Sequence, residues 1–525
     1  MNRQRFVSHL RNVVLAALAC AAAPAFCAQG DERPPLPVGI NLRAVTPYDR
    51  EWVFADAMKL ASPWGYVDPH AKPRSRSAGR PADDSSDDGG VPVDERGWPR
   101  PAAGRTIACQ VFVGMPGHFP AGRYVCTWKG SGRFAFRGAL RVASEGDHRV
   151  ELDVDPDSGG AIELQLQGSD ASDPTTDIRL WLPGLETTGA TFHPLFLERL
   201  RPFSVLRFYP WMRVYTSSGR WGRRSTPASA RQSTSEGVAV EYMVELCNEL
   251  RADPWFCMPH VADDEYVRSF AELVRDTLSP ERRVYVEFSN EVWNTDYGAG
   301  QWARAEAQRR DVPLAQVTAE GAARVFAIWH EVFGAAKERV VRVASGQLHN
   351  PGVARALCRQ LGGQLDAIAV GAYFAARSDR DDVDRESSPA KLLACARRNL
   401  ADLVLPRIAD HHALAETLSR ALGRPIALLA YEGGQSIVGR GAGGGLDPAA
   451  TLACQELPEM FTAYRELIDG ARARGLELFV GYDFAGARNN GDTFSVLQYL
   501  DQPIEDAAKY RALIQGWEDR NLLPR

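Results

Sequence analysis

The 525-residue sequence lacks the short motifs that most readily identify nucleotide- and metal-dependent proteins. No G-x-G-x-x-G or P-loop pattern is present, which argues against a nucleotide-binding sheet. No C-x-x-C pair and no metal-ligand spacing of histidine and cysteine occurs, so neither a metal nor a cofactor is expected. The net charge of −5 also argues against a nucleic-acid-binding surface.

Long apolar runs are also missing. No run approaches the roughly 20 residues needed to cross a bilayer, so no membrane span is expected. Three arginines stand among the first eleven residues, followed by an apolar stretch from Val13 to Ala23 and by small residues. This order predicts a signal peptide over residues 1–28 and a secreted or periplasmic protein. Because Leu18-Ala19-Cys20 weakly resembles a lipidation box, lipoprotein anchoring at Cys20 is an alternative.

Cysteine is sparse. Seven cysteines remain after the expected signal peptide, and this odd number leaves at least one without a partner in the chain. Cys109 and Cys126 lie on consecutive expected strands and could form a disulfide in an oxidising compartment. The sequence does not predict an oligomeric state.

Composition divides the rest of the chain into four segments. Residues 31–66 begin a first apolar domain, and residues 67–96 are mostly Pro, Ser, Gly, Arg and Asp, which predicts a flexible loop or linker. Residues 97–184 contain short alternating runs such as TIACQVFVG and HRVELDV, separated by turn residues. This pattern predicts an inserted antiparallel β-sandwich-like domain. Residues 190–525 return to strands that alternate with helices.

Eight apolar strands, mostly followed by helices, predict an α/β fold with a closed (β/α)8 TIM barrel. The first strand runs from Val38 to Val45, with a helix expected through Trp52 and Leu60, and residues 190–525 supply the other seven strands. An open doubly wound sheet is the rival fold, but it usually has fewer strands and a glycine-rich first loop. A TIM barrel places its active site at the C-terminal strand ends.

Polar and aromatic residues gather at these strand ends. Glu291 and Glu432 each end a buried strand, where an unpaired charge is costly, so the two predict one shared catalytic site. The other residues can hydrogen-bond a hydroxyl-rich ligand or stack on a sugar ring. Besides Asn41, the expected substrate-binding residues are Arg207, Trp211, His260, Asn290, Trp293, Tyr297, Gln347, Tyr373 and Tyr482.

Several segments resemble a known family. Asn290-Glu291 and Glu432 resemble the catalytic pattern of the clan A retaining glycoside hydrolases, which are TIM barrels. VLRFYPWM, ADPWFCMPHVADDEYV, VYVEFSNEVWN and AYEGGQSIVG are similar to secreted bacterial proteins often described as cellulose-binding or glycoside-hydrolase-like. This likeness covers residues 38–66 and 193–510 and includes the inserted β domain.

The resemblance implies a role for each matched residue. Glu291 would be the general acid/base and Glu432 the nucleophile, while Arg207 would keep Glu432 ionised. Asn290 would bond the sugar 2-hydroxyl, and Tyr373 would orient Glu432. The implied activity is hydrolysis of β-glycosidic bonds in a polysaccharide or oligosaccharide by double displacement, with the two carboxyls about 5 Å apart.

The sequence departs from the clan pattern at two strand ends. Tyr482 and Phe484 stand where clan members often have a tryptophan, and Gly371-Ala372-Tyr373 stands where His-x-Tyr is common. Sugar identity, linkage and endo or exo action are therefore not predicted. A carbohydrate-binding protein that has lost turnover is the rival function, and a transglycosylase is a third.

Structural roles are alternatives for individual residues. Glu291 could cap a helix that begins directly after it, and Glu432 could be a turn residue before two glycines. Arg207 could form a salt bridge at the barrel mouth, and His260 could satisfy a loop carbonyl. Asp263 and Asp264 are expected to cap the next helix.

Overall fold

The computed structural model describes residues 36–67, 90–101, 104–439, 445–488 and 492–515. The expected signal peptide, Cys20 and residues 68–89 of the expected linker lie outside this range. None of the helices within it combines the length and hydrophobicity of a membrane span.

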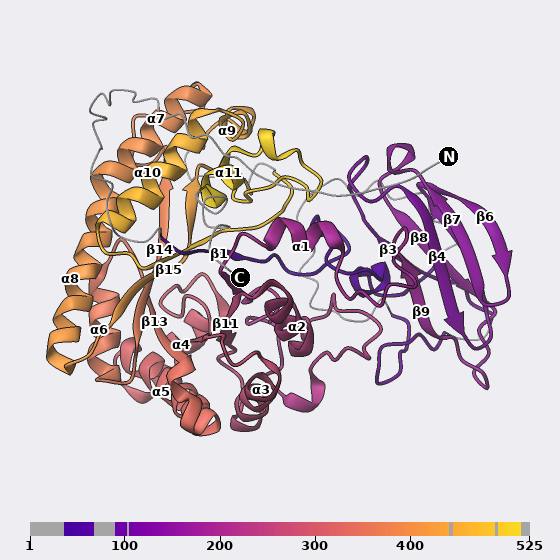
Figure 1. Ribbon diagram of the computed structural model, residues 1–525, viewed down its shortest axis with the longest axis horizontal. Coiled ribbons are helices and arrows are strands. Elements are labelled where there is room, and N and C mark those ends of the chain that lie inside the picture. Colours follow the sequence, from indigo (N-terminus) through magenta and orange to yellow (C-terminus); the bar gives the residue numbers. More distant parts are fainter. Residues whose placement is uncertain (1–35, 68–89, 102–103, 440–444, 489–491, 516–525) are drawn as a thin grey trace, which may run out of the picture. The chain divides into compact units, whose positions relative to one another are not determined.

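Eight parallel strands close into a barrel (Figure 1), which confirms the predicted (β/α)8 fold. In order around the barrel they are β1 (Val38–Asn41), β10 (Val205–Arg207), β11 (Asp253–Met258), β12 (Val284–Phe288), β13 (Val340–Gly346), β14 (Ala367–Ala375), β15 (Ala427–Ser436) and β16 (Leu478–Gly481). Pairing of β1 with β16, with Gly39 opposite Val480, completes the ring. All five residues of β12 are buried, as parallel strands covered by helices require.

Helices surround the barrel (Figure 1). They are α1 (Pro194–Leu200), α2 (Val240–Leu250), α3 (Asp264–Thr277), α4 (Gly298–Arg310), α5 (Leu314–Phe333), α6 (Pro351–Leu361), α7 (Pro389–Asn399), α8 (Leu405–Leu422), α9 (Pro448–Cys454), α10 (Glu459–Ala473) and α11 (Ala508–Ile514). Short 3-10 helices are η1 (Ala57–Leu60), η2 (Pro156–Ser158), η3 (Trp221–Arg223), η4 (Gly334–Arg339) and η6 (Ile504–Asp506), and η5 (Leu400–Val404) is a π-helical segment between α7 and α8. Asp263 caps α3 as expected, because its carboxylate accepts a 2.8 Å bond from the amide of Tyr266.

The prediction of a helix through Trp52 and Leu60 was wrong for most of that segment. Only η1 is helical, and the residues before it form isolated bridges, with Phe54 opposite Phe192 and Asp56 opposite Trp181. These bridges hold the chain extended, so the apolar residues of this segment are buried without helical periodicity.

Two antiparallel four-stranded sheets follow, as predicted for the insertion. One has the order β2 (Gly65–Tyr66), β3 (Ile107–Val111), β8 (Ile162–Gln167), β5 (Arg133–Gly138), and the other β6 (Leu140–Gly146), β7 (Arg149–Val154), β4 (Gly122–Lys129), β9 (Thr176–Trp181). Alternate residues of β3 and β7 are buried, which is the period of a sheet with one face in a core. No disulfide joins Cys109 and Cys126, both of which are buried free thiols.

Asp56 bonds the first barrel segment to strand β9. Its carboxylate accepts hydrogen bonds from the amide of Leu180 (2.9 Å) and from the Arg179 guanidinium (3.1 Å). The residue is only 5% exposed, and a buried carboxylate needs such donors. The segment before the insertion and the insertion itself therefore share buried polar contacts.

Gly433 and Gly434 lie inside β15, so their neighbour Glu432 is a strand residue and not a turn residue. A Cβ on Gly433 would lie 2.7 Å from the carbonyl oxygen of Ala372, and Gly434 has a φ of 135°. The two glycines thus allow close contact between β15 and its surroundings.

We predict that Gly433→Ala destabilises the protein by about 1–3 kcal/mol, because backbone atoms of β14 must move to admit the methyl group. Thermal unfolding measures the loss. Gly222→Ala is the control, since nothing lies within 4 Å of a Cβ at that position. Equal melting temperatures for both variants would contradict this account.

Candidate active site

Glu291 lies just beyond strand β12, where the backbone turns sharply. Ser289 has a φ of 56° and Glu291 a φ of 45°, a left-handed conformation that residues other than glycine seldom adopt. Such conformations concentrate at functional sites. The next helix, α4, begins only at Gly298, so Glu291 does not cap a helix beginning at Val292.

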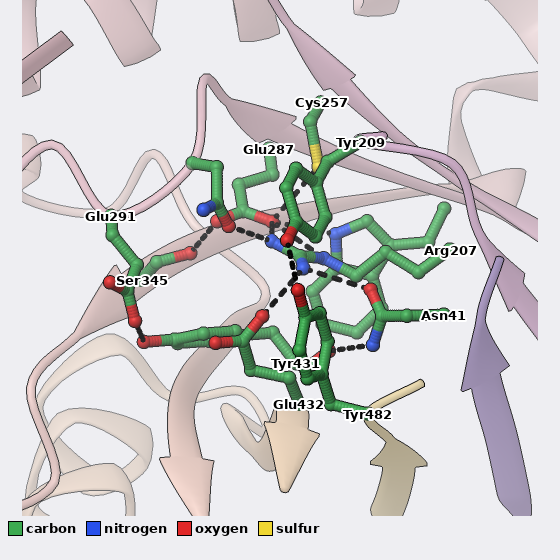
Figure 2. A network of polar contacts seen from close by, with 12 residues as sticks. Asn41, Arg207, Tyr209, Cys257, Glu287, Glu291, Ser345, Tyr431, Glu432 and Tyr482 are labelled. Atoms are coloured by element: carbon green, nitrogen blue, oxygen red, sulfur yellow. Dashed lines mark hydrogen bonds and ion pairs between the residues drawn. The ribbon is translucent and has the colours of Figure 1, made fainter. Parts of the chain in front are cut away.

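A β-bulge in strand β15 brings Glu432 and its neighbour to the same site. Val370 of β14 pairs with Ala430, whereas Gly371 pairs with Glu432, which leaves Tyr431 as the extra residue. A bulge interrupts the alternation of side chains across a strand and can re-aim them. As a result, Tyr431 and Glu432 both contribute to the polar network of Figure 2.

Arg207, at the end of β10, is the centre of this network (Figure 2). Its guanidinium donates to Glu287 at 2.8 Å, to Asn290 at 2.6 Å and to Asn41 at 3.1 Å. The contact with Glu432 is longer, at 3.4 Å. Arg207 therefore pairs with Glu287 first and with the predicted nucleophile second.

Glu287 is an inward-facing residue of β12 and is 1% exposed. Besides Arg207, the indole of Trp255 (2.9 Å) and the thiol of Cys257 (3.3 Å) donate to its Oε2. The hydroxyl of Ser345 donates to its Oε1. Both carboxylate oxygens therefore accept hydrogen bonds, three donor groups reaching Oε2 and one reaching Oε1.

Glu291 and Glu432 have separate donors. The hydroxyl of Tyr431 donates to Glu291 Oε1 at 2.8 Å, and the amide of Asn294 donates to Oε2 at 3.0 Å. The hydroxyl of Tyr373 bonds Glu432. Because Tyr431 and Glu432 are adjacent in the chain, the bond from Tyr431 links the two carboxyls in one pocket.

The electrostatics of this pocket favour protonated carboxyls. Burial raises the pKa of Glu432 to about 8, and the charge of Glu291 adds to this, while Arg207 and Tyr373 oppose it. Burial also raises the pKa of Glu291. Hydrogen bonds from Asn294 and Tyr431 lower this pKa, but the effect of burial is larger. Two neighbouring carboxyls in one buried site resist ionising together, so we expect the pair to hold about one proton at neutral pH.

Besides Arg207 and Asn41, three of the expected binding residues belong to this site, namely Asn290, Tyr373 and Tyr482. Asn290 accepts from Arg207 and donates to the Tyr215 hydroxyl at 2.6 Å, which leaves its second N–H for a ligand. The hydroxyl of Tyr482 accepts from Tyr209 at 3.0 Å, and its ring packs edge-on against Tyr373.

Other expected residues lie around it. Tyr297 is 40% exposed and stacks on Tyr215 with ring centroids 5.1 Å apart, which forms an accessible aromatic face. Trp293 is half-buried. His260 is half-buried too, packs against Trp302, and has its pKa lowered by burial.

The structure does not bring Trp211 or Gln347 to the carboxyls. Trp211 is 0% exposed and packs on Phe208, so the expectation that it stacks on a sugar was wrong. Gln347 pairs through its backbone with Asn350. Among the described residues, no hydrogen bond joins Gln347 to Glu291 or Glu432.

Sequence reasoning missed Glu287, Tyr431, Tyr209, Tyr215 and Asn294 as site residues. Glu287 carried a usable signal, because it is an ionisable residue in the middle of an otherwise apolar strand. The role of Tyr431 depends on the bulge, which the sequence does not reveal. In the described part of the chain, no group of three His, Cys, Asp or Glu side chains is arranged to hold a metal ion.

Comparison with solved structures returns glycoside hydrolases at low identity. A family 51 arabinofuranosidase from Xanthomonas axonopodis pv. citri is 15% identical, with a TM-score of 0.39, over 62% of this chain and 66% of that one. A family 51 α-L-arabinofuranosidase from Bifidobacterium longum is 11% identical, with a TM-score of 0.41 over the same shares.

A family 39 glycoside hydrolase from Bacteroides cellulosilyticus WH2 is 11% identical, with a TM-score of 0.36, over 75% of this chain and 77% of that one. The chain thus spans just under two thirds of the length of the two family 51 proteins. No protein-family model and no curated protein sequence matches it. At these identities and TM-scores the comparisons assign neither a family nor an activity to this chain.

We predict that Glu432→Gln raises the stability of the protein relative to the wild type, and that this gain is larger at higher pH. Between pH 4.5, the ordinary pKa, and about 8, the folded state binds more protons at this carboxyl than the unfolded state. Stability of the wild type therefore falls with rising pH over this window, and glutamine removes that loss. Calorimetry at about pH 5 and about pH 8 should show the gain in melting temperature growing with pH.

Asp366→Asn is the control. Burial disfavours ionisation of Asp366, but bonds from Arg342 outweigh it and lower the pKa below the ordinary 3.8. Asp366 is therefore ionised at both test values, and its loss should lower the melting temperature equally at each. A gain for Glu432→Gln that does not change with pH would contradict the raised pKa.

Proposed function

We propose that this protein is a retaining glycoside hydrolase that cleaves β-linked glycosidic bonds in a polysaccharide or oligosaccharide. The observation that carries the proposal is the pair Glu291 and Glu432, which are both buried, are linked by the charge of Glu291 and by the bond from Tyr431, and both have raised pKa values. A double displacement needs one carboxyl protonated and the other ionised. The reactive form of this pair is the one in which the shared proton is on Glu291 and Glu432 is ionised.

The reaction divides the two roles as follows. In the first step, Glu432 attacks the anomeric carbon while Glu291 gives its proton to the departing glycosidic oxygen. This breaks the glycosidic bond and forms a glycosyl ester. In the second step, Glu291 takes a proton from water as the water oxygen attacks the same carbon, and Glu432 leaves as a carboxylate.

Neighbouring side chains support these steps. Tyr373 bonds Glu432 and holds it for attack, while Tyr431 and Asn294 fix the two oxygens of Glu291. The free N–H of Asn290 is placed for a sugar hydroxyl, and the Tyr297 ring offers an apolar face. Residues 1–28 motivate the further proposal that the enzyme is secreted or periplasmic.

The first test is a screen of wild type, Glu291→Gln and Glu432→Gln on β-glucans, mannans and aryl β-glycosides. We expect turnover by the wild type and a loss of at least about 1,000-fold in each variant. Nuclear magnetic resonance of the first product should show a β-anomer, since two inversions retain configuration. Asp366→Asn controls for loss of a carboxylate outside the site.

Three outcomes would overturn or redirect the proposal. Glycan binding with no released reducing ends would favour a binding protein. Transfer of the sugar to an added sugar alcohol in preference to water would favour a transglycosylase. An α-anomer as first product would exclude the double displacement.

We predict that Glu287→Gln moves both limbs of the pH–rate profile to lower pH. The charge of Glu287 raises the pKa of both catalytic carboxyls, and it also pairs with Arg207. Without that charge, the Arg207 guanidinium acts more strongly on Glu432 and stabilises its ionised form. The profile of kcat/KM against pH measures the shift, and Asp366→Asn should leave it in place. A lower rate with unmoved limbs would contradict the prediction and assign Glu287 a purely structural role.

A further inference from the structure

A cavity of about 370 Å³ lies between the barrel wall and two helices. Its inner wall is formed by the ends of β12 and β13, and its outer walls by α5 and α6, which pack against each other and against these strands. Protein interiors are normally close-packed, and ligand sites usually begin at about 300 Å³. The space is therefore large enough for a ligand.

The lining is mostly apolar, and besides Glu287 its polar side chains are Thr318, Ser345 and Asn350. Each helix turns a face of small or aliphatic residues toward the space, including Ala315, Thr318 and Ala322 of α5 and Val353 and Ala356 of α6. Four of these five are only half-buried, as expected beside unfilled space. Of the residues that line the cavity, Glu287 alone is charged, and its oxygens are bonded within the barrel. The occupant should therefore be apolar and uncharged.

The cavity adjoins the catalytic pocket on the side of Glu291. Val292 and Trp293, which directly follow Glu291, line it, as do Glu287 and Ser345 of the network in Figure 2.

We infer that this cavity binds an apolar group, an alkyl chain or an aryl ring, carried by the leaving group of the substrate. The inference rests on the proposed function, because Glu291 would protonate the leaving oxygen and the cavity lies next to Glu291. The substrate class is then a glycoside with an apolar aglycone, which is narrower than a glycan of uniform sugars.

The kinetic test uses a series of alkyl β-glycosides from methyl to octyl, on the sugar that the wild type hydrolyses fastest. For the wild type, kcat/KM should rise by at least about tenfold along the series as methylene groups are buried. Ala356→Phe and Ala315→Phe fill the cavity from opposite helices and should abolish the rise while methyl glycoside turnover remains. Ala327→Phe, on the exposed face of α5, is the matched control and should keep the rise.

A binding test separates this inference from the proposed function. Calorimetry with 1-octanol should show binding to the wild type and to Ala327→Phe, and at least about tenfold weaker binding to both cavity-filling variants. This result would support the cavity even if no glycoside were hydrolysed. Turnover without any chain-length dependence, or octanol binding that all variants share, would overturn the inference and leave the hydrolase proposal intact.

Discussion

The Arg207 guanidinium is fully buried at the end of β10, and its charge constrains everything around it. An isolated charge in such a place is very costly, so its partners must be held at hydrogen-bond distance. Those partners come from β1, from β12 and the turn after it, and from β15. One side chain thereby fixes the relative positions of strands that are distant in sequence.

The charge of Arg207 is divided between two carboxylates, and this division affects the pKa of Glu432. Glu287 makes the shorter contact with Arg207, so Glu432 receives only part of the stabilisation that a guanidinium can give. The raised pKa of Glu432 follows from this division as well as from burial. A carboxyl that is poised near neutral pH fits proton sharing with Glu291 better than one held fully ionised would.

The sequence predicted the barrel, the insertion and the two glutamates because each has a local signature. Apolar strands, alternating strands and an acid at a buried strand end can all be recognised within a few residues. The features that the sequence could not predict depend on residues that are close in space but distant in the chain. Trp211 was expected at the surface of the site but is enclosed by residues such as Phe208, and Arg207 was assigned to Glu432 although Glu287 contacts it more closely.

The site around Glu432 illustrates the same limit. Strand periodicity would direct adjacent side chains to opposite faces, yet the bulge places both Tyr431 and Glu432 in the polar network around Arg207. The bulge depends on how β15 pairs with β14, so the local sequence of β15 does not predict which way these side chains point. The neighbouring glycines misleadingly resembled a turn, whereas they allow β15 to approach Ala372 and Tyr464.

The position of β1 in the barrel has a consequence for folding. Asn41 and Arg207 lie on adjacent strands but are 166 residues apart in the chain, and the other neighbour of β1 is the last strand, β16. During synthesis the first strand emerges long before either partner, with its backbone groups unpaired. The antiparallel sheets form from contacts that are much closer in sequence, so they are expected to fold first and to shorten the loop that β1 must close. We therefore expect the insertion to assist closure of the barrel by bringing β1 closer to β10 during folding.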